Sequence, residues 1–175
     1  MRTSLLALPV SLAVAAAFSL ALRAGGSDSS EPLAVAPAGA PGAEELTLAP
    51  GLSFTDDSSS NFPIRGRHLT EGRIASDRPT IVFYGTSHCW NTNREAERFV
   101  ALYEKRKDRA RFLVVDLEHP SADQRRLVQR FYGGRIPHLT VLDARGRTVY
   151  NRPGETARER GDTSALEKLL DEAAD

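Results

Sequence analysis

Hydrophobic and polar residues follow two different periods along the second half of the chain, and each period predicts one kind of element. A continuous apolar and β-branched run at 80–84 (TIVFY) ends at Gly85, which is typical of a buried β-strand. One apolar helical face then follows, made of Ala96, Phe99, Val100 and Tyr103. The charged residues of this stretch fall off that face, and they include Arg94, Glu97, Arg98 and Glu104. The pattern therefore predicts a strand followed by a helix.

A second strand and a second helix follow in the same way. Residues 111–117 (RFLVVDL) are too continuously apolar for a strand with one wet face, so we expect a central strand covered on both sides. Ser121 and Gln124 fit a capping box, which marks the start of a helix. The buried face of that helix is expected to consist of Leu127, Val128, Phe131 and Tyr132. Gly133 and Gly134 end it.

A hairpin and a last helix complete the pattern. Residues 139–142 and 148–150 flank a short turn at 143–146, so they predict two antiparallel strands. A final helix is expected over 163–173. The order β-α-β-α-β-β-α combines one parallel β-α-β unit with one hairpin, so helices must cover both faces of a mixed sheet. Residues 64–175 are therefore expected to form a three-layer α/β sandwich.

The first 63 residues show neither the hydrophobic period of a strand nor that of a helix. A basic start is followed by an uncharged stretch over residues 5–22, so we assign 1–24 to a signal peptide or an N-terminal membrane anchor. Residues 25–63 are rich in Pro, Ala, Gly and Ser and predict a disordered linker. The protein is therefore expected outside the cytoplasm, in a bacterial periplasm or secreted, with membrane attachment through residues 5–22 as the alternative to cleavage.

Composition and charge exclude several classes of function. The 175-residue chain carries 23 basic and 23 acidic residues, and no basic run is interleaved with aromatic residues. Nucleic-acid binding is therefore not expected. Four histidines and one cysteine show no metal-ligand spacing, so the sequence predicts no metal and no cofactor.

The single cysteine, Cys89, is the candidate reactive group. It lies between the strand at 80–84 and the helix that follows, where free N–H groups and the positive end of the helix dipole favour a thiolate. Because the chain has no second cysteine, no internal disulfide can form. A buried cysteine that acts as a small hydrophobic residue is the alternative.

Two short stretches resemble a known family. The run 84–89 (YGTSHC) at the end of a strand and the run 134–138 (GRIPH) before the hairpin are similar to the thioredoxin fold, over roughly residues 64–175. The resemblance implies an α/β protein with a thioredoxin-like three-layer α/β/α sandwich and a mixed central sheet. It also implies that Pro137 is cis and lies against Cys89.

The chain departs from the family pattern Cys-x-x-Cys, because Thr92 stands in place of the second cysteine. Phe83 also stands where thioredoxin buries an aspartate. A dithiol cycle within one chain is thus excluded, and the Cys-x-x-Thr motif resembles that of monothiol glutaredoxins. The expected chemistry is monothiol exchange, in which Cys89 forms a mixed disulfide with a protein or peptide. An external low-molecular-weight thiol or a reductase then releases it.

Thr92 and Trp90 are the nearest candidate partners of the thiol. The Thr92 hydroxyl, one helical turn beyond Cys89, can donate to the sulfur or cap the helix. Trp90 can offer an apolar platform to a polypeptide or seal the start of the helix. Both alternatives stay open for each residue.

The remaining candidates come from the loops around the site. Ile136 and Pro137 are expected to bind substrate together with Trp90. His88 and His138 are candidates for tuning the thiol, with a surface role as the alternative. Asp116 and Glu118 are expected as solvated loop charges.

Two further interpretations stay open. The chain can be a non-catalytic binding module whose groove around Trp90 and Pro137 holds a peptide. It can also form a covalent dimer through Cys89.

Overall fold

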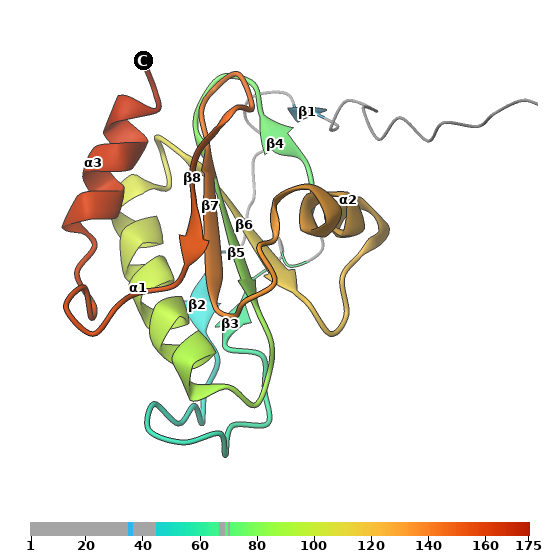
Figure 1. Ribbon diagram of the computed structural model, residues 1–175, viewed down its shortest axis with the longest axis vertical. Coiled ribbons are helices and arrows are strands. Elements are labelled where there is room, and N and C mark those ends of the chain that lie inside the picture. Colours follow the sequence, from blue (N-terminus) through green and yellow to red (C-terminus); the bar gives the residue numbers. More distant parts are fainter. Residues whose placement is uncertain (1–34, 37–44, 67–68, 70) are drawn as a thin grey trace, which may run out of the picture. The chain divides into compact units, whose positions relative to one another are not determined.

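The computed structural model describes residues 35–36, 45–66, 69 and 71–175 (Figure 1). The signal peptide or anchor predicted for residues 1–24 lies outside the described residues, as does most of the linker predicted before residue 45. In the part of the chain that is described, no helix has both the length and the apolar character needed to cross a membrane.

A four-stranded mixed sheet forms the centre of the molecule (Figure 1). Its strand order is β6-β5-β7-β8, and the strands are β5 (Thr80–Gly85), β6 (Arg111–Asp116), β7 (His138–Leu142) and β8 (Thr148–Pro153). β5 pairs in parallel with β6 and antiparallel with β7, and β7 pairs antiparallel with β8. β5 and β7 are buried at every residue, because each has a neighbour on both edges and helices on both faces. β8 is an edge strand and is largely exposed.

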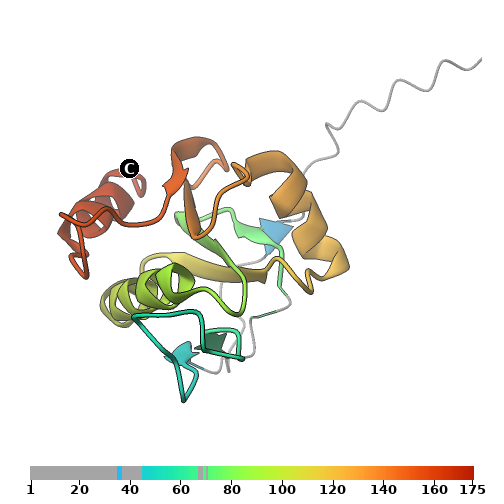
Figure 2. The ribbon, with the colours of Figure 1, turned by 60° about the horizontal axis from the view of Figure 1, so that its bottom comes forward.

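Three helices cover the two faces of this sheet (Figures 1 and 2). α1 (Trp90–Arg106) and α3 (Ser164–Glu172) lie on one face, and α2 (Ala122–Phe131) lies on the other. Successive side chains of β5 alternate between the layers, so Phe83 packs with Phe99 of α1 whereas Tyr84 packs with Leu127 of α2. The predicted thioredoxin-like three-layer α/β/α sandwich with a mixed central sheet is confirmed.

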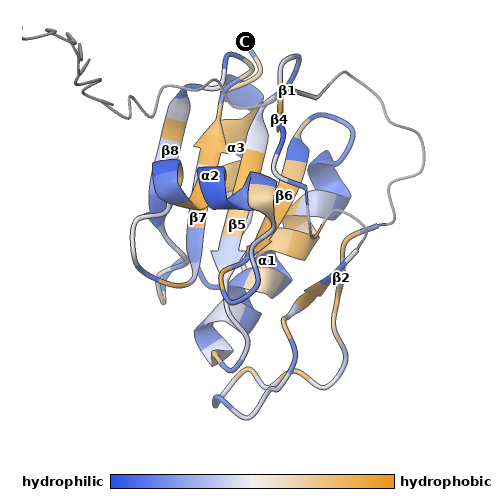
Figure 3. Cartoon of the chain, turned by 90° about the vertical axis from the view of Figure 1, so that its right-hand side faces the viewer, coloured by the Kyte–Doolittle hydropathy of each residue, from blue (hydrophilic) through white to orange (hydrophobic). Residues whose placement is uncertain are grey.

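The core follows the predicted apolar runs. In Figure 3 the hydrophobic residues run along the central strands, and the outer side of α2 is mostly hydrophilic. The capping box of α2 is also confirmed, since the Ser121 side chain accepts from the Gln124 N–H and the Gln124 side chain accepts from the Ser121 N–H, both at 3.2 Å. The side-chain amide of Gln124 then donates to the Val114 carbonyl at 2.8 Å, which fixes α2 against β6.

Residues 45–63 differ from the linker that their composition predicted. Leu46 is fully buried in the core beside α1, and β2 (Thr47–Leu48) pairs antiparallel with β3 (Ile64–Arg65). Another short pair joins β1 (Val35–Ala36) in parallel to β4 (Ile74–Ala75). The folded part therefore begins before residue 64, because a few buried side chains anchor a segment that is otherwise rich in turn-forming residues.

Candidate functional site

Cys89 lies where the sequence placed it, between β5 and α1. It is the N-cap residue of α1, with an extended backbone (φ −138, ψ 106), and its carbonyl accepts the first helical bond from the Asn93 N–H at 3.1 Å. The sulfur makes no capping hydrogen bond, and the free thiol is partly exposed. Cys89 is therefore an accessible thiol at a helix start, and not a buried hydrophobic residue.

Two carboxylates hold the backbone on either side of Cys89. Glu118, just beyond β6, accepts from the Ser87 N–H at 2.9 Å, and Asp57 accepts from the Trp90 N–H at 2.9 Å. The bonds from Ser87 lower the pKa of Glu118, and the nearby charge of His88 adds to the effect. The loop that carries the thiol is thus fixed by acidic side chains from two distant segments.

Sequence reasoning interpreted Glu118 as a solvated loop charge, and it did not single out Asp57. For Glu118 a signal existed, because the parallel register pairs Gly85 with Asp116, and two further residues bring Glu118 beside Ser87. Asp57 lies in the predicted linker, and no periodic pattern connects it to a backbone group 33 residues away.

His88 is exposed and has a left-handed backbone conformation, with φ at 51. Few non-glycine residues adopt this conformation, and here it turns the chain from β5 towards α1. The segment before Cys89 is therefore a tight turn. His88 interacts electrostatically with Glu118, which is the role that the structure assigns to it.

Thr92 has a packing role in this structure. Its side chain is fully buried, and its methyl carbon faces β5 so closely that a Cβ built on Gly85 would lie 2.4 Å from it. Among the described residues the Thr92 hydroxyl finds no hydrogen-bond partner, so neither the expected bond to the Cys89 sulfur nor a helix cap is formed. Phe83 lies against the same point of β5, at 2.9 Å from the Cβ built on Gly85, and its ring centre is 5.4 Å from that of Phe99, so Thr92 borders the apolar core between β5 and α1.

Trp90 is half-buried, and the guanidinium of Arg94 lies 5.7 Å from the centre of its ring. A cation over an indole ring is a stabilising arrangement that orders both side chains. Trp90 therefore keeps part of its ring at the surface while the other part packs at the start of α1.

Ile136 and Pro137 lie next to the first turn of α1. Their peptide bond is cis, which is the isomer that the resemblance implies, and Ile136 is exposed whereas Pro137 is buried. A pocket of about 340 Å³ joins this loop to α1, and its walls include Asn91, Arg94, Ile136, Pro137, Glu155 and Arg160. The structure thus brings two of the predicted substrate-binding residues to the helix that Cys89 caps.

His138 belongs to the opposite layer. It is 3% exposed, its Nε2 lies 2.5 Å from the Asn151 side-chain oxygen, and its ring packs between Tyr84 and Tyr132. Because Tyr84 is part of the core beneath α2, His138 faces that side of the sheet. The expectation that His138 tunes the thiol is corrected: alternate residues of a strand face opposite layers, and this one faces α2.

A buried acid on α1 was also missed. Glu95 is completely buried, and burial raises its pKa to about 7. Its Oε2 atom accepts from the Glu155 N–H at 2.5 Å and lies 3.7 Å from the guanidinium of Arg98, which is itself 3% exposed. A Cβ built on Gly154 would come within 2.9 Å of the Glu95 carboxylate and 2.7 Å of Pro137, so Glu95 lies behind the Pro137 loop.

The part of the chain that is described contains no group of three or more His, Cys, Asp or Glu side chains that could hold a metal ion.

No protein-family model and no curated protein matches the chain. Among solved structures, it is similar to the germline-specific thioredoxin Deadhead of Drosophila melanogaster, with 16% identity and a TM-score of 0.42 over 55% of this chain and 81% of that one. It is also similar to Fasciola hepatica thioredoxin (14% identity, TM-score 0.43, over 55% and 82%) and to Arabidopsis thaliana thioredoxin O2 (15% identity, TM-score 0.43, over 54% and 76%). The order and pairing of its own strands and helices give this chain a thioredoxin-like fold.

Proposed function

We propose that the protein is an exported thioredoxin-like protein that carries out monothiol disulfide exchange through Cys89. The observation that carries this proposal is the position of the only cysteine, a partly exposed thiol that caps α1 directly after β5. A helix start and a partly exposed position are features of reactive cysteines. Export is supported by the uncharged stretch over residues 5–22.

The exchange would proceed in two balanced steps. The Cys89 thiolate attacks one sulfur of a substrate disulfide, a new S–S bond forms to Cys89, and the other sulfur leaves as a thiolate that takes a proton from water. An external thiol then attacks the substrate sulfur of this mixed disulfide. It forms a disulfide with the substrate and restores the Cys89 thiolate.

Proteins or peptides are the substrates that fit the surroundings of Cys89. Ile136 is exposed, Trp90 is half-exposed, and the pocket between Asn91 and Pro137 is open to solvent. Apolar surface beside a polar pocket is suited to an extended polypeptide that places its disulfide over the thiol. A low-molecular-weight thiol or a reductase would supply the second sulfur.

One observation favours a second candidate function, a non-catalytic binding module. Asp57 and Glu118 occupy backbone donors on both sides of Cys89, and Thr92 gives the sulfur no hydrogen bond. A thiol that accepts no hydrogen bond from its neighbours is not activated by them. In that case the pocket beside Pro137 would be the functional feature. A Cys89-linked dimer is the third alternative.

Mass spectrometry of a mixed disulfide separates these functions. We expect the full chain, incubated with a disulfide-bonded peptide, to form an adduct at Cys89 that glutathione releases, and Cys89→Ser to form none. If wild type forms no adduct although iodoacetamide still alkylates Cys89, the exchange function is wrong. Peptide binding that persists in Cys89→Ser without exchange would identify the binding module. A doubled mass on non-reducing gels that Cys89→Ser abolishes would identify the dimer.

A further inference from the structure

Residues 53–59, which we call the strap, lie against the first turns of α1 (Figures 1 and 2, teal). The Asn93 side-chain amide donates to the Ser53 carbonyl at 2.6 Å and to the Ser59 hydroxyl at 2.9 Å. Ser59 also accepts from the Ser53 N–H at 2.6 Å, which closes the strap on itself. Asn93 is fully buried and Ser59 is 2% exposed, so these bonds are shielded from water and the strap has a defined position.

The strap contacts the start of α1 through one carboxylate. Asp57 is its contact with the helix start, because its Oδ1 atom accepts from the N–H of Trp90, the residue bonded to Cys89. α1 has no acidic residue of its own in the first turn. The carboxylate at the positive end of this helix is therefore supplied by another segment, and it binds the residue next to Cys89 in the chain.

We infer that Asp57 restrains the reactivity of Cys89, so that the strap sets how nucleophilic the thiol is. Two effects act in the same direction. Asp57 takes a donor that could otherwise stabilise negative charge at the start of α1, and its own negative charge repels a thiolate beside it. Asp57 is in this sense a positioning residue that acts on the reaction through the helix start.

The inference rests on the proposed chemistry of Cys89, but it concerns only how fast the sulfur reacts. In alkylation by iodoacetamide, the Cys89 thiolate displaces iodide and forms a thioether, and no disulfide is involved. The same restraint applies to attack on 2-hydroxyethyl disulfide, in which an S–S bond forms to Cys89 and 2-mercaptoethanol leaves. Both reagents are uncharged, so neither is attracted or repelled by the protein.

The test compares Asp57→Asn with two variants that remove the same charge elsewhere. Asp57→Asn keeps an oxygen that can accept from Trp90 and removes only the charge. Glu97→Gln alters the exposed side of α1, and Asp56→Asn alters a strap residue that bonds to Ser58 rather than to the helix. Far-UV circular dichroism checks that all three variants are folded.

At neutral pH and low salt, we expect Asp57→Asn to react with iodoacetamide about fivefold faster than wild type, which is the factor for one unit charge removed at close range in a watery environment. The two control variants should stay within about twofold of wild type. High salt should reduce the difference between Asp57→Asn and wild type, because Asp57 is exposed and salt screens its charge. A merely loosened strap would leave the difference unchanged.

Equal or slower alkylation in Asp57→Asn overturns the inference. Equal acceleration in all three variants also overturns it, because the effect would then follow net charge and not the contact with Trp90. The outcomes stay separate from those for the proposed function. If Asp57→Asn speeds alkylation but no mixed disulfide forms with a peptide, the exchange function fails and the restraint stands. If exchange occurs and Asp57→Asn leaves the alkylation rate unchanged, the exchange function stands and the restraint by Asp57 is wrong.

Discussion

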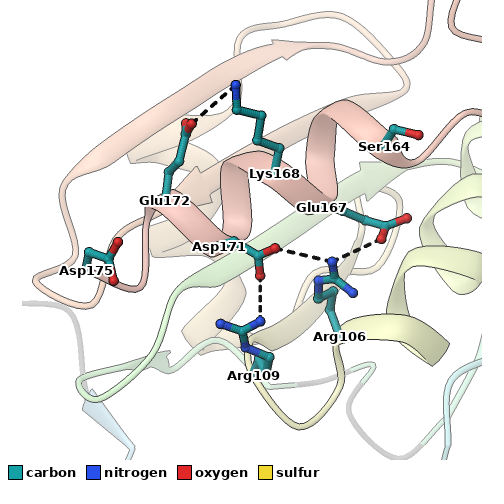
Figure 4. Close-up of a pocket in the computed structure, with 8 residues that line it drawn as sticks. All are labelled: Arg106, Arg109, Ser164, Glu167, Lys168, Asp171, Glu172 and Asp175. Carbon is teal, nitrogen blue, oxygen red and sulfur yellow. Dashed lines mark hydrogen bonds and ion pairs between the residues drawn. The ribbon is translucent and has the colours of Figure 1, made fainter.

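The two ends of helix α1 are stabilised in different ways. At its C-terminal end, Arg106 pairs with Glu167 at 3.1 Å and Asp171 at 3.3 Å, and Arg109 pairs with Asp171 at 2.9 Å (Figure 4). The basic residues of this last turn, which include Lys105, suit the negative end of the helix dipole, and the acidic partners come from α3. The groove that Figure 4 shows is lined by charges of both signs that pair with each other.

At the N-terminal end the helix has no acidic residue of its own in the first turn, and its partner is Asp57 from the strap. The residues behind this end are buried, and several of their polar atoms have no partner among the described residues, which holds for Thr92, Asn93 and Glu95. The C-terminal end of α1 is therefore joined to α3 by ion pairs. The other end carries the partly exposed thiol and a buried acid whose pKa is raised, and both are typical of functional sites.

The largest difference between the two ends should appear in the pH dependence of stability. Glu95, near the N-terminal end, has its pKa raised by burial to about 7 from its ordinary value of 4.5. Between these values the folded state binds more protons than the unfolded state, so the free energy of unfolding falls as pH rises through this window. Above pH 7 the free energy of unfolding is lower by about 3 kcal/mol than below pH 4.5 because of this group.

We expect wild type to lose this stability between about pH 4.5 and 7, and Glu95→Gln not to show that loss. Urea unfolding at several pH values measures it. The slopes of the free energy of unfolding against pH are compared, and not its absolute values, because Arg98 loses its ionic partner in the variant and the absolute stability changes as well. Contributions from all other groups are common to the two proteins and cancel in the difference. Parallel curves for the two proteins would show that Glu95 does not ionise in this range.

The packing of the N-terminal end gives the second prediction. A methyl group at Gly85 would lie 2.4 Å from the Thr92 Cγ2 atom and 2.9 Å from the Phe83 ring, and neither neighbour has room to move. We expect Gly85→Ala to lower the free energy of unfolding by about 2 kcal/mol, as overpacking of a core does. Denaturant unfolding measures the loss.

Thr92→Ser supplies the matched control, because it removes the methyl group that clashes. The double variant Gly85→Ala/Thr92→Ser should lose less stability than the two single variants together, since the two residues are in contact. Additive losses would mean that the contact between β5 and α1 does not limit the residue at position 85.

The sequence predicted the elements whose burial follows a simple period. The runs at 80–84 and 111–117 are apolar at successive positions because both faces of β5 and β6 are covered, and this pattern needs no knowledge of the partner. The capping box of α2 is equally local, since both of its hydrogen bonds join residues three apart. Cys89 could be placed for the same reason, because it follows one predicted element and precedes another.

The rest of the site depends on contacts that leave no period in the sequence. Glu95 and Arg98 fall off the apolar face of α1, yet both are buried because the polar loop after β8 covers them through contacts such as that from Glu155. Asp57 binds a backbone N–H, and any residue at position 90 other than proline would offer that group. Hydrophobic patterning detects apolar burial, and it does not detect polar residues that another polar segment covers.

The smallest effect on the free energy of unfolding is expected at the C-terminal end of α1. Glu167 accepts from Lys105 at 2.8 Å and from the Thr163 hydroxyl at 2.6 Å, and these bonds lower its pKa. Its contribution is therefore present above about pH 4.5 and is lost as pH falls, which is opposite in sign to that of Glu95. We expect Glu167→Gln to lower the free energy of unfolding by about 0.5–1 kcal/mol at neutral pH, and by less in high salt, because these charges are near the surface.

The rate of Cys89 alkylation should stay the same in Glu167→Gln, since α1 separates the two sites by its full length of 17 residues. Urea unfolding and iodoacetamide kinetics on the same samples check both statements. A changed alkylation rate would mean that α1 transmits a change from one end to the other as a rigid unit. Unchanged kinetics with a modest loss of stability would show that the ion pairs stabilise the contact between α1 and α3 and that the thiol is independent of this end of the helix.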